Sequence, residues 1–144
     1  VSLGPLLEDV LSQGRHIGAG HEFELNTERL PETAYLDPIM IRIMLRNLLE
    51  NAVKYSPIGS RITMGGDVDN SDRLILEVTD EGPGLDDSQA LHLFGKYVRG
   101  QNAGTVSGTG MGLYIVQRIV ELHGGDISVR SRPELGTTFR VAIP

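Results

Sequence analysis

The sequence predicts an α+β fold: a two-layer sandwich in which about five strands form a mixed, mostly antiparallel sheet with three main helices on one face. Two observations support this prediction. Three segments repeat apolar residues at steps of three and four, as amphipathic helices do, and several shorter segments between turn residues have the pattern of strands. With 144 residues, the chain has the length of one domain with a sizeable core.

Composition narrows the range of partners. The net charge of −6 and the pI of about 5.1 argue against nucleic acid and against direct contact with anionic membranes. The absence of cysteine excludes disulfides and thiolate metal sites, and no apolar run has the length of a membrane span. The chain begins at Val1 without a Met, so we expect it to be a fragment of a longer protein.

The first elements are short. Apolar residues at helical spacing predict a helix over Leu3–Gln13 that ends near Gly14. His21–Asn26 alternates apolar and acidic side chains and predicts a strand, and Ala34–Leu36 predicts a short extended piece.

The segment Asp37–Tyr55 predicts the central helix. Asp37 suits the N-cap and Pro38 the first helical position. One face is apolar, and a second face carries Asn47, Glu50, Asn51, Lys54 and Tyr55. Asparagine is a poor helix former, so two on one face favour a ligand site where carbonyls meet a hard cation and a lysine meets phosphate. An ordinary solvated face is the alternative.

Arg61–Val68 and Arg73–Asp80 predict two strands of a hairpin. Period-two alternation places Asp80 on the buried face, where its carboxylate needs a donor. Such an acceptor suits the exocyclic amine of adenine and repels the carbonyl of guanine. The alternative is that Asp80 only stabilises the turn Glu81–Gly84.

The second half continues with a short helix over Asp86–Phe94, a glycine-rich functional loop over Gly95–Gly108 and a buried helix over Met111–His123. Two closing strands are expected at Asp126–Arg130 and Thr137–Ile143. The sheet face away from the helices is expected to be solvated, since it carries Glu77, Thr79, Arg130 and Arg140.

The segment Gly108–Gly112 (GTGMG) leads into the Met111 helix. Backbone amides at a helix N-terminus bind anions, which favours a phosphate site of neither the dinucleotide nor the Walker type. Loop flexibility is the alternative explanation.

Four segments together resemble a known family. They resemble the four sequence boxes of bacterial sensor histidine kinases, and they occur in the same order. The N box matches Asn47–Pro57 (NLLENAVKYSP), the G1 box Asp80–Leu85 (DEGPGL), the F box Leu93–Arg99 (LFGKYVR) and the G2 box Gly108–Leu113 (GTGMGL). The later ELHGG and GTTF segments resemble the end of the same domain. The resemblance implies the Bergerat fold, shared with gyrase and mismatch-repair ATPases, and a catalytic and ATP-binding domain.

The resemblance implies ATP and Mg²⁺ as cofactors. Asn51 matches the Mg²⁺ ligand, Lys54 a residue that meets phosphate, and Asp80 the carboxylate that binds the adenine amine. The other implied nucleotide contacts are Asn47, Tyr55, Gly82, Gly84, Leu85, Phe94, Gly108, Thr109, Gly110, Met111, Gly112 and Leu113.

The resemblance places an ATP lid at residues 86–110. Phe94 matches the lid phenylalanine, and Arg99 matches an arginine near the γ-phosphate. The chain departs from the common pattern at Gly95, where an acidic residue is usual, and at Tyr97, where a second phenylalanine is usual.

One position separates kinases from hydrolases in this superfamily. The hydrolases resemble one another in a glutamate four residues before the metal-binding asparagine, but this chain has Asn47, which cannot act as a base. Glu50 resembles the acid that assists transfer in the kinases. The expected catalytic residues are Glu50, Asn47 and Arg99, and the expected reaction is phosphoryl transfer to histidine.

The acceptor histidine is expected in a separate dimerisation domain that this chain lacks, because His21 lacks the acceptor motif. Residues 1–144 are then one catalytic domain, with the end of a linker in residues 1–14. A response-regulator receiver domain is the second expected partner.

We expect a monomeric fragment, a homodimeric parent and a cytoplasmic domain, even where the parent is anchored in the inner membrane. A superfamily ATPase that hydrolyses ATP, or a nucleotide-binding regulatory module without transfer, are the alternatives.

Overall fold

The structure is a computed structural model that describes residues 1–18, 20–82, 111–132 and 136–144. These residues form, in order, α1 (Leu3–Ile17), β1 (Glu22–Asn26), α2 (Pro38–Tyr55), β2 (Arg61–Val68), β3 (Leu74–Asp80), α4 (Met111–Leu122), β4 (Asp126–Arg132) and β5 (Gly136–Ile143). The expected helix over residues 86–94 and the loop over residues 95–108 lie outside the described residues.

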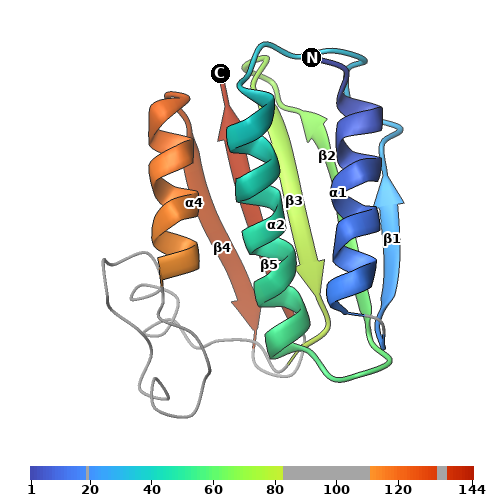
Figure 1. Cartoon of the computed structure of the whole chain (residues 1–144). Coiled ribbons are helices and arrows are strands. Elements are labelled where there is room, and N and C mark those ends of the chain that lie inside the picture. The colour runs from blue at the N-terminus through green and yellow to red at the C-terminus, as the bar shows by residue number, and fades with distance from the viewer. Residues whose placement is uncertain (19, 83–110, 133–135) are drawn as a thin grey trace.

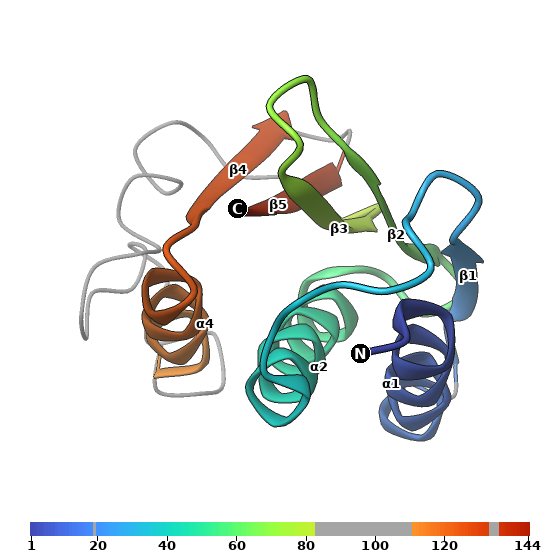
Figure 2. The ribbon, with the colours of Figure 1, turned by 90° about the horizontal axis from the view of Figure 1, so that it is seen from above.

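The strands form one five-stranded sheet in the order β1-β2-β3-β5-β4. β1 pairs with β2 in parallel, and every other neighbouring pair is antiparallel. All three described helices cover the same face of the sheet (Figures 1 and 2). The predicted α+β sandwich with a mixed, mostly antiparallel sheet is therefore confirmed.

The core lies between the helices and the sheet. α2 packs between α1 and α4 and against β3. Buried side chains from α1 and α2 are Leu3, Leu6, Leu7, Val10, Leu11, Ile41, Met44, Leu45, Leu48, Leu49 and Ala52. Because α2 uses one face for the core, its polar face is directed away from the sheet.

The N-terminus of α2 forms as the sequence predicts. The Asp37 side chain accepts hydrogen bonds from the backbone N–H of Ile39 at 2.9 Å and of Met40 at 3.1 Å. These are two of the amides that a helix start leaves without an intrahelical partner. Asp37 therefore fixes where α2 begins.

Three elements are longer than predicted. α1 continues through Gly14 to Ile17, β4 continues to Arg132, and β5 begins at Gly136. Gly14 is buried, and a Cβ atom there would lie 3.0 Å from Leu49 Cδ1. The glycine that predicted the end of the helix instead lies inside it and allows close packing of α1 on α2.

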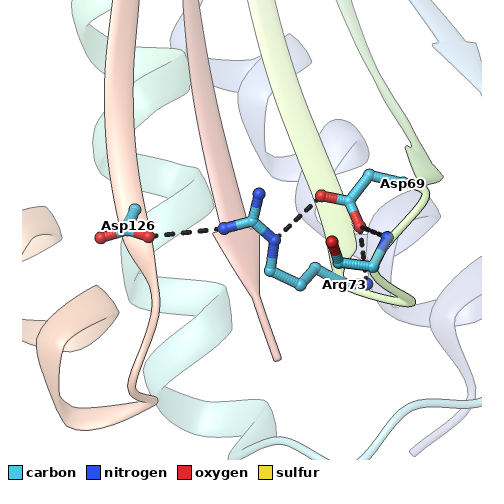
Figure 3. A network of polar contacts seen from close by, with 4 residues as sticks. Asp69, Arg73 and Asp126 are labelled. Atoms are coloured by element: carbon cyan, nitrogen blue, oxygen red, sulfur yellow. Dashed lines mark hydrogen bonds and ion pairs between the residues drawn. The ribbon is translucent and has the colours of Figure 1, made fainter.

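The β2–β3 turn is organised by Asp69. One oxygen of this carboxylate accepts from the backbone N–H groups of Ser71 and Arg73, each at 2.9 Å. The Arg73 guanidinium lies 2.9 Å from the other Asp69 oxygen and 3.5 Å from a carboxylate oxygen of Asp126 (Figure 3). The Arg73 amide above all, with Ser71 and the guanidinium, lowers the pKa of Asp69. The network ties the turn to the start of β4.

The opposite face of the sheet is polar and lies in contact with solvent, as predicted: Arg130 is exposed, and Glu77, Thr79 and Arg140 are partly exposed. It contains a hollow of about 370 Å³ beside β2 and β3, lined by Asn26, Glu28, Arg29, Thr63, Gly65, Gly66, Asp67, Glu77 and Thr79. This hollow is separated by the sheet from the polar face of α2.

Candidate functional site

The polar face of α2 is the starting point of the candidate site. Asn47, Glu50 and Asn51 are partly buried, whereas Lys54 in the last turn is exposed. Tyr55 closes the helix, and its side chain lies outside the described part of the structure. The helix therefore holds the predicted residues on one side, as their spacing requires.

Asn47 is oriented by its own helix. Its Nδ2 donates to the backbone carbonyl of Ile43, one turn earlier, at 2.8 Å. A side-chain amide has donors on nitrogen and an acceptor oxygen. With the nitrogen bound to the helix, the carbonyl oxygen of Asn47 is the end of the amide left to face a ligand.

Asn51 has an incompletely satisfied amide. Its Nδ2 is buried and has no hydrogen-bond partner among the described residues. A buried amide group without a partner costs about 1–3 kcal/mol, so such groups in native proteins need an explanation. A bound ligand with an acceptor oxygen would provide one.

Glu50 forms an ion pair within α2. Its Oε1 lies 3.3 Å from Nε of Arg46, and the two side chains are 41% and 56% exposed. The pair lies along the helix surface at the border of the polar face. Glu50 therefore occupies the edge of the candidate site.

Asp80 ends β3 on the face that the helices cover. It is buried, with 5% of its surface exposed, and its Oδ1 accepts from the Gly82 N–H at 2.8 Å. Burial raises the pKa of Asp80, against the opposing effect of hydrogen bonds from the amides of Gly82 and Thr137. The carboxylate does stabilise its turn, yet it has more acceptor positions than these two amides occupy.

The start of α4 lies near the polar face of α2. α4 runs antiparallel to α2 (Figure 1), and His123, just after α4, contacts the Asp37 backbone at the start of α2. With a rise of 1.5 Å per residue, Asn51 lies about 20 Å along α2 from Asp37. Met111 lies about 18 Å along α4 from His123, so the first turn of α4 stands at the level of Asn51.

Three of the predicted parts thus meet at one end of the molecule. The last turns of α2, the first turn of α4 and the end of β3 lie at the same end (Figure 1). The backbone of Met111, Gly112 and Leu113 forms that first turn of α4. The remaining predicted residues, Gly84, Leu85, Phe94, Arg99, Gly108, Thr109 and Gly110, lie outside the described residues.

The chemistry of the described groups fits ATP with Mg²⁺. The Asn51 amide can place its oxygen on a hard cation and its unpartnered nitrogen on a phosphate oxygen. Asp80 adds a buried acceptor, and the N-terminus of α4 adds backbone amides and the positive end of a helix dipole.

Two contacts of α2 were not predicted. The spacing of Arg46 and Glu50 at i and i+4 is a recognisable ion-pair signal. The contact of His123 with Asp37 joins residues 86 positions apart and has no local signal. His123, which follows α4 directly, also contacts its own helix through the backbone oxygen of Ile119.

A family model described as "Histidine kinase-, DNA gyrase B-, and HSP90-like ATPase" matches residues 36–144. The chain is 43% identical over 107 residues to the sensor protein KdpD of Escherichia coli, which covers 74% of this chain and 12% of KdpD. It is 36% identical over 143 residues to the adaptive-response sensory kinase SasA of Synechococcus elongatus, covering 97% of this chain and 37% of SasA. The chain therefore spans well under half the length of these relatives.

Solved structures share the fold over the whole chain. The mycobacterial sensor histidine kinase MprB aligns with a TM-score of 0.83 and 25% identity, covering 100% of this chain and 95% of that one. Full-length ShkA in complex with AMPPNP aligns with a TM-score of 0.87 and 24% identity, covering 100% of this chain and 30% of that one. The predicted resemblance to histidine kinase catalytic domains is confirmed.

Proposed function

Because the chain belongs to the histidine kinase-, DNA gyrase B- and HSP90-like ATPase family, we propose that it is the catalytic domain of a sensor histidine kinase. It binds ATP·Mg²⁺ and supplies the γ-phosphoryl group to a histidine in a separate dimerisation domain. That phosphoryl group then passes to an aspartate of a response regulator. Relatives named as sensory kinases or sensor histidine kinases support this assignment over other members of the family.

The observation that carries the proposal is the unpartnered, buried amide of Asn51. It lies on the same face of α2 as Asn47 and at the level of the first turn of α4. A polar group that the free protein leaves unsatisfied is expected where a ligand completes its hydrogen bonds.

The predicted site residues that lie in the described part of the structure each have a role in holding the nucleotide. Asn51 holds Mg²⁺, with the carbonyl of Asn47 beside it, and Lys54 meets the phosphates. Asp80 accepts from the adenine amine, with the Gly82 backbone next to it. When bound, Mg²⁺ neutralises charge that develops on the phosphate oxygens. Arg99 and the lid, in residues 86–110, are proposed from resemblance alone.

Transfer is favoured over hydrolysis by the residues at the edge of the site. Asn47 occupies the position of the hydrolase base, and its amide has no basic nitrogen. Glu50 is paired with Arg46 and partly exposed, so it can meet a hydroxyl, a water or an imidazole that enters from outside. In this proposal the incoming group is the imidazole of the acceptor histidine.

The partners follow from this role. They are the dimerisation domain with its acceptor histidine, and the receiver domain of a response regulator. None of the helices in the described ranges is long and apolar enough to cross a membrane. We propose that the domain works in the cytoplasm as part of a dimeric kinase.

The test combines this chain, a dimerisation domain that carries the acceptor histidine, and ATP labelled at the γ-phosphate. The expected product is an acid-labile phosphohistidine on the dimerisation domain, absent when the chain carries Asn51→Ala. ATP binding without phosphohistidine would instead identify a regulatory module. Steady release of inorganic phosphate without phosphohistidine would identify a hydrolase.

A further inference from the structure

The two helices that flank the proposed nucleotide site are joined at their far ends by one side chain. His123 Nε2 accepts from the backbone N–H of Asp37 at 3.1 Å, and His123 Nδ1 lies 2.8 Å from the backbone oxygen of Ile119. Ile119 belongs to α4, and Asp37 is the N-cap of α2. The imidazole therefore bridges the end of one helix and the start of the other.

The two partners determine the protonation of the ring. A carbonyl oxygen can only accept a hydrogen bond, so Nδ1 must carry a proton. A backbone N–H can only donate, so Nε2 must be unprotonated. The contact requires the neutral imidazole with its proton on Nδ1. No other charge state or tautomer satisfies both partners.

Capping of α4 does not require this side chain. Gly124 has a positive φ of 71°, and the N–H groups of Gly124 and Gly125 donate to the carbonyls of Glu121 and Val120 at 2.9 and 3.0 Å. This backbone pattern closes the helix end by itself. The imidazole therefore adds something besides a cap.

The start of α2 has a complementary requirement. The Asp37 carboxylate binds the amides of Ile39 and Met40, but neither of these bonds uses the amide of Asp37 itself. That amide donates to the His123 ring. Each partner thus provides a group that its own helix does not use.

We propose that His123 is a positioning residue for the nucleotide: it fixes the axial position of α4 relative to α2 and so places the first turn of α4 beside Asn51. The inference rests on the proposed function, because it assigns His123 a role in binding ATP. A shift along the helix axes at the His123 end moves the α4 N-terminus by the same amount, since a helix is stiff over about 18 Å.

Two substitutions separate the contacts of the ring. His123→Asn places an amide nitrogen near the position of Nδ1, so it keeps the contact with Ile119 but cannot reach Asp37. His123→Gln places an amide oxygen near the position of Nε2, so it can still accept from Asp37. Each variant keeps one of the two hydrogen bonds, and His16→Asn, at an exposed position in α1, is the control.

The measurements are ATP·Mg²⁺ affinity by calorimetry, thermal stability, and hydrogen exchange of the Asp37 amide. We expect His123→Asn to bind ATP·Mg²⁺ about three- to tenfold more weakly, as the loss of one hydrogen bond allows, with faster exchange at Asp37. His123→Gln and His16→Asn should bind like the parent. In the parent, ring ¹⁵N shifts should report the proton on Nδ1.

Equal ATP affinity in His123→Asn and His123→Gln, with the parent binding normally, would overturn the inference and leave His123 as a structural contact only. Failure of the parent to bind ATP·Mg²⁺ is a different result, because it would overturn the proposed function itself.

Discussion

At the residue scale, the proposed site contains groups whose positions do not favour the stability of the free protein. Asn51 keeps a buried amide nitrogen without a partner, and Asp80 keeps a carboxylate under the helices. The Asn51 amide breaks the usual rule that buried polar groups have a hydrogen-bond partner, and the buried Asp80 carboxylate has acceptor positions beyond those that the Gly82 and Thr137 amides occupy. Such exceptions are expected where a protein is arranged for a ligand.

Replacing Asn51 with Ala should therefore separate binding from stability. The variant removes an unsatisfied buried amide, which costs the folded protein about 1–3 kcal/mol of stability, and it loses only limited packing. We expect an unfolding free energy equal to or above that of the parent, with loss of Mg²⁺-dependent ATP binding. Urea unfolding and calorimetry measure the two quantities. Asn70→Ala, at an exposed position in the β2–β3 turn, is the control; binding by Asn51→Ala at the parent affinity would contradict the assignment.

Asp80→Asn tests the buried carboxylate. The folded pKa of Asp80 is raised above its unfolded value, so the folded state holds the proton more tightly. Stability from this group is full below the unfolded pKa and decreases as pH rises through the folded pKa. An asparagine side chain does not titrate, so Asp80→Asn lacks this decrease in stability. The free energy of unfolding of the variant relative to that of the parent should therefore increase as pH rises from the unfolded pKa to the folded pKa of Asp80, and it should stay constant at higher pH.

Urea unfolding between about pH 3 and pH 8 measures this difference, since the range spans the ordinary carboxyl pKa. The same variant should bind ATP and GTP with more similar affinities, because Asn offers a donor as well as an acceptor. Unchanged preference for ATP over GTP would place the adenine elsewhere.

At the element scale, α2 is the central helix, and it contacts α1, α4 and the sheet. Its apolar face packs on the sheet, α1 packs against one side of it, and the backbone of its N-cap residue Asp37 donates a hydrogen bond to His123 at the end of α4. The close approach of α1 depends on Gly14, where a Cβ atom would lie 3.0 Å from Leu49 Cδ1 and 3.6 Å from Phe23 Cε1.

Two glycines of α1 provide a matched pair. Gly14→Ala adds a methyl group against Leu49, which is 1% exposed and cannot move into solvent. We expect a loss of about 1–3 kcal/mol. Gly4→Ala meets no atom within 4 Å and should gain up to about 1 kcal/mol from helix propensity. Chemical denaturation of both variants measures this contrast, and equal effects would mean that α1 and α2 are not in close contact at Gly14.

Sequence reasoning succeeded at this scale where the signal is local. The start of α2 at Asp37 and Pro38 follows from capping chemistry within four residues. The end of α1 was misplaced because Gly14 reads as a helix stop, whereas its role is set by Leu49 on another helix. Local patterns do not report which neighbour a glycine must accommodate.

At the scale of the whole molecule, the strand order explains both the fold and the placement of the site. The antiparallel pairing of β3 with β5 sets Asp80 opposite Thr137, whose amide contributes to binding the carboxylate. The order β1-β2-β3-β5-β4 depends on contacts between distant segments, so neither local propensity nor periodicity predicts it. The resemblance to a family predicted the mixed, mostly antiparallel sheet with helices on one face, but no strand order was predicted.

The same limit applies to the site. The motif residues Asn47, Asn51 and Asp80 were identified from sequence, but the unpartnered amide and the His123 contact required the positions of the other elements. Whether the motif residues act as proposed is a question for the binding and transfer experiments.

The position of β5 also governs when the domain can be completed during synthesis. β5 is the final strand of this chain, yet it lies inside the sheet, between β3 and β4. As the polypeptide leaves the ribosome, β1, β2 and β3 can assemble early, but Asp80 lacks the neighbouring Thr137 until β5 emerges. A nascent chain that has not yet reached β5 leaves the inner edge of β3 unpaired, and the pairing that sets Asp80 opposite Thr137 forms only after β5 has been synthesised.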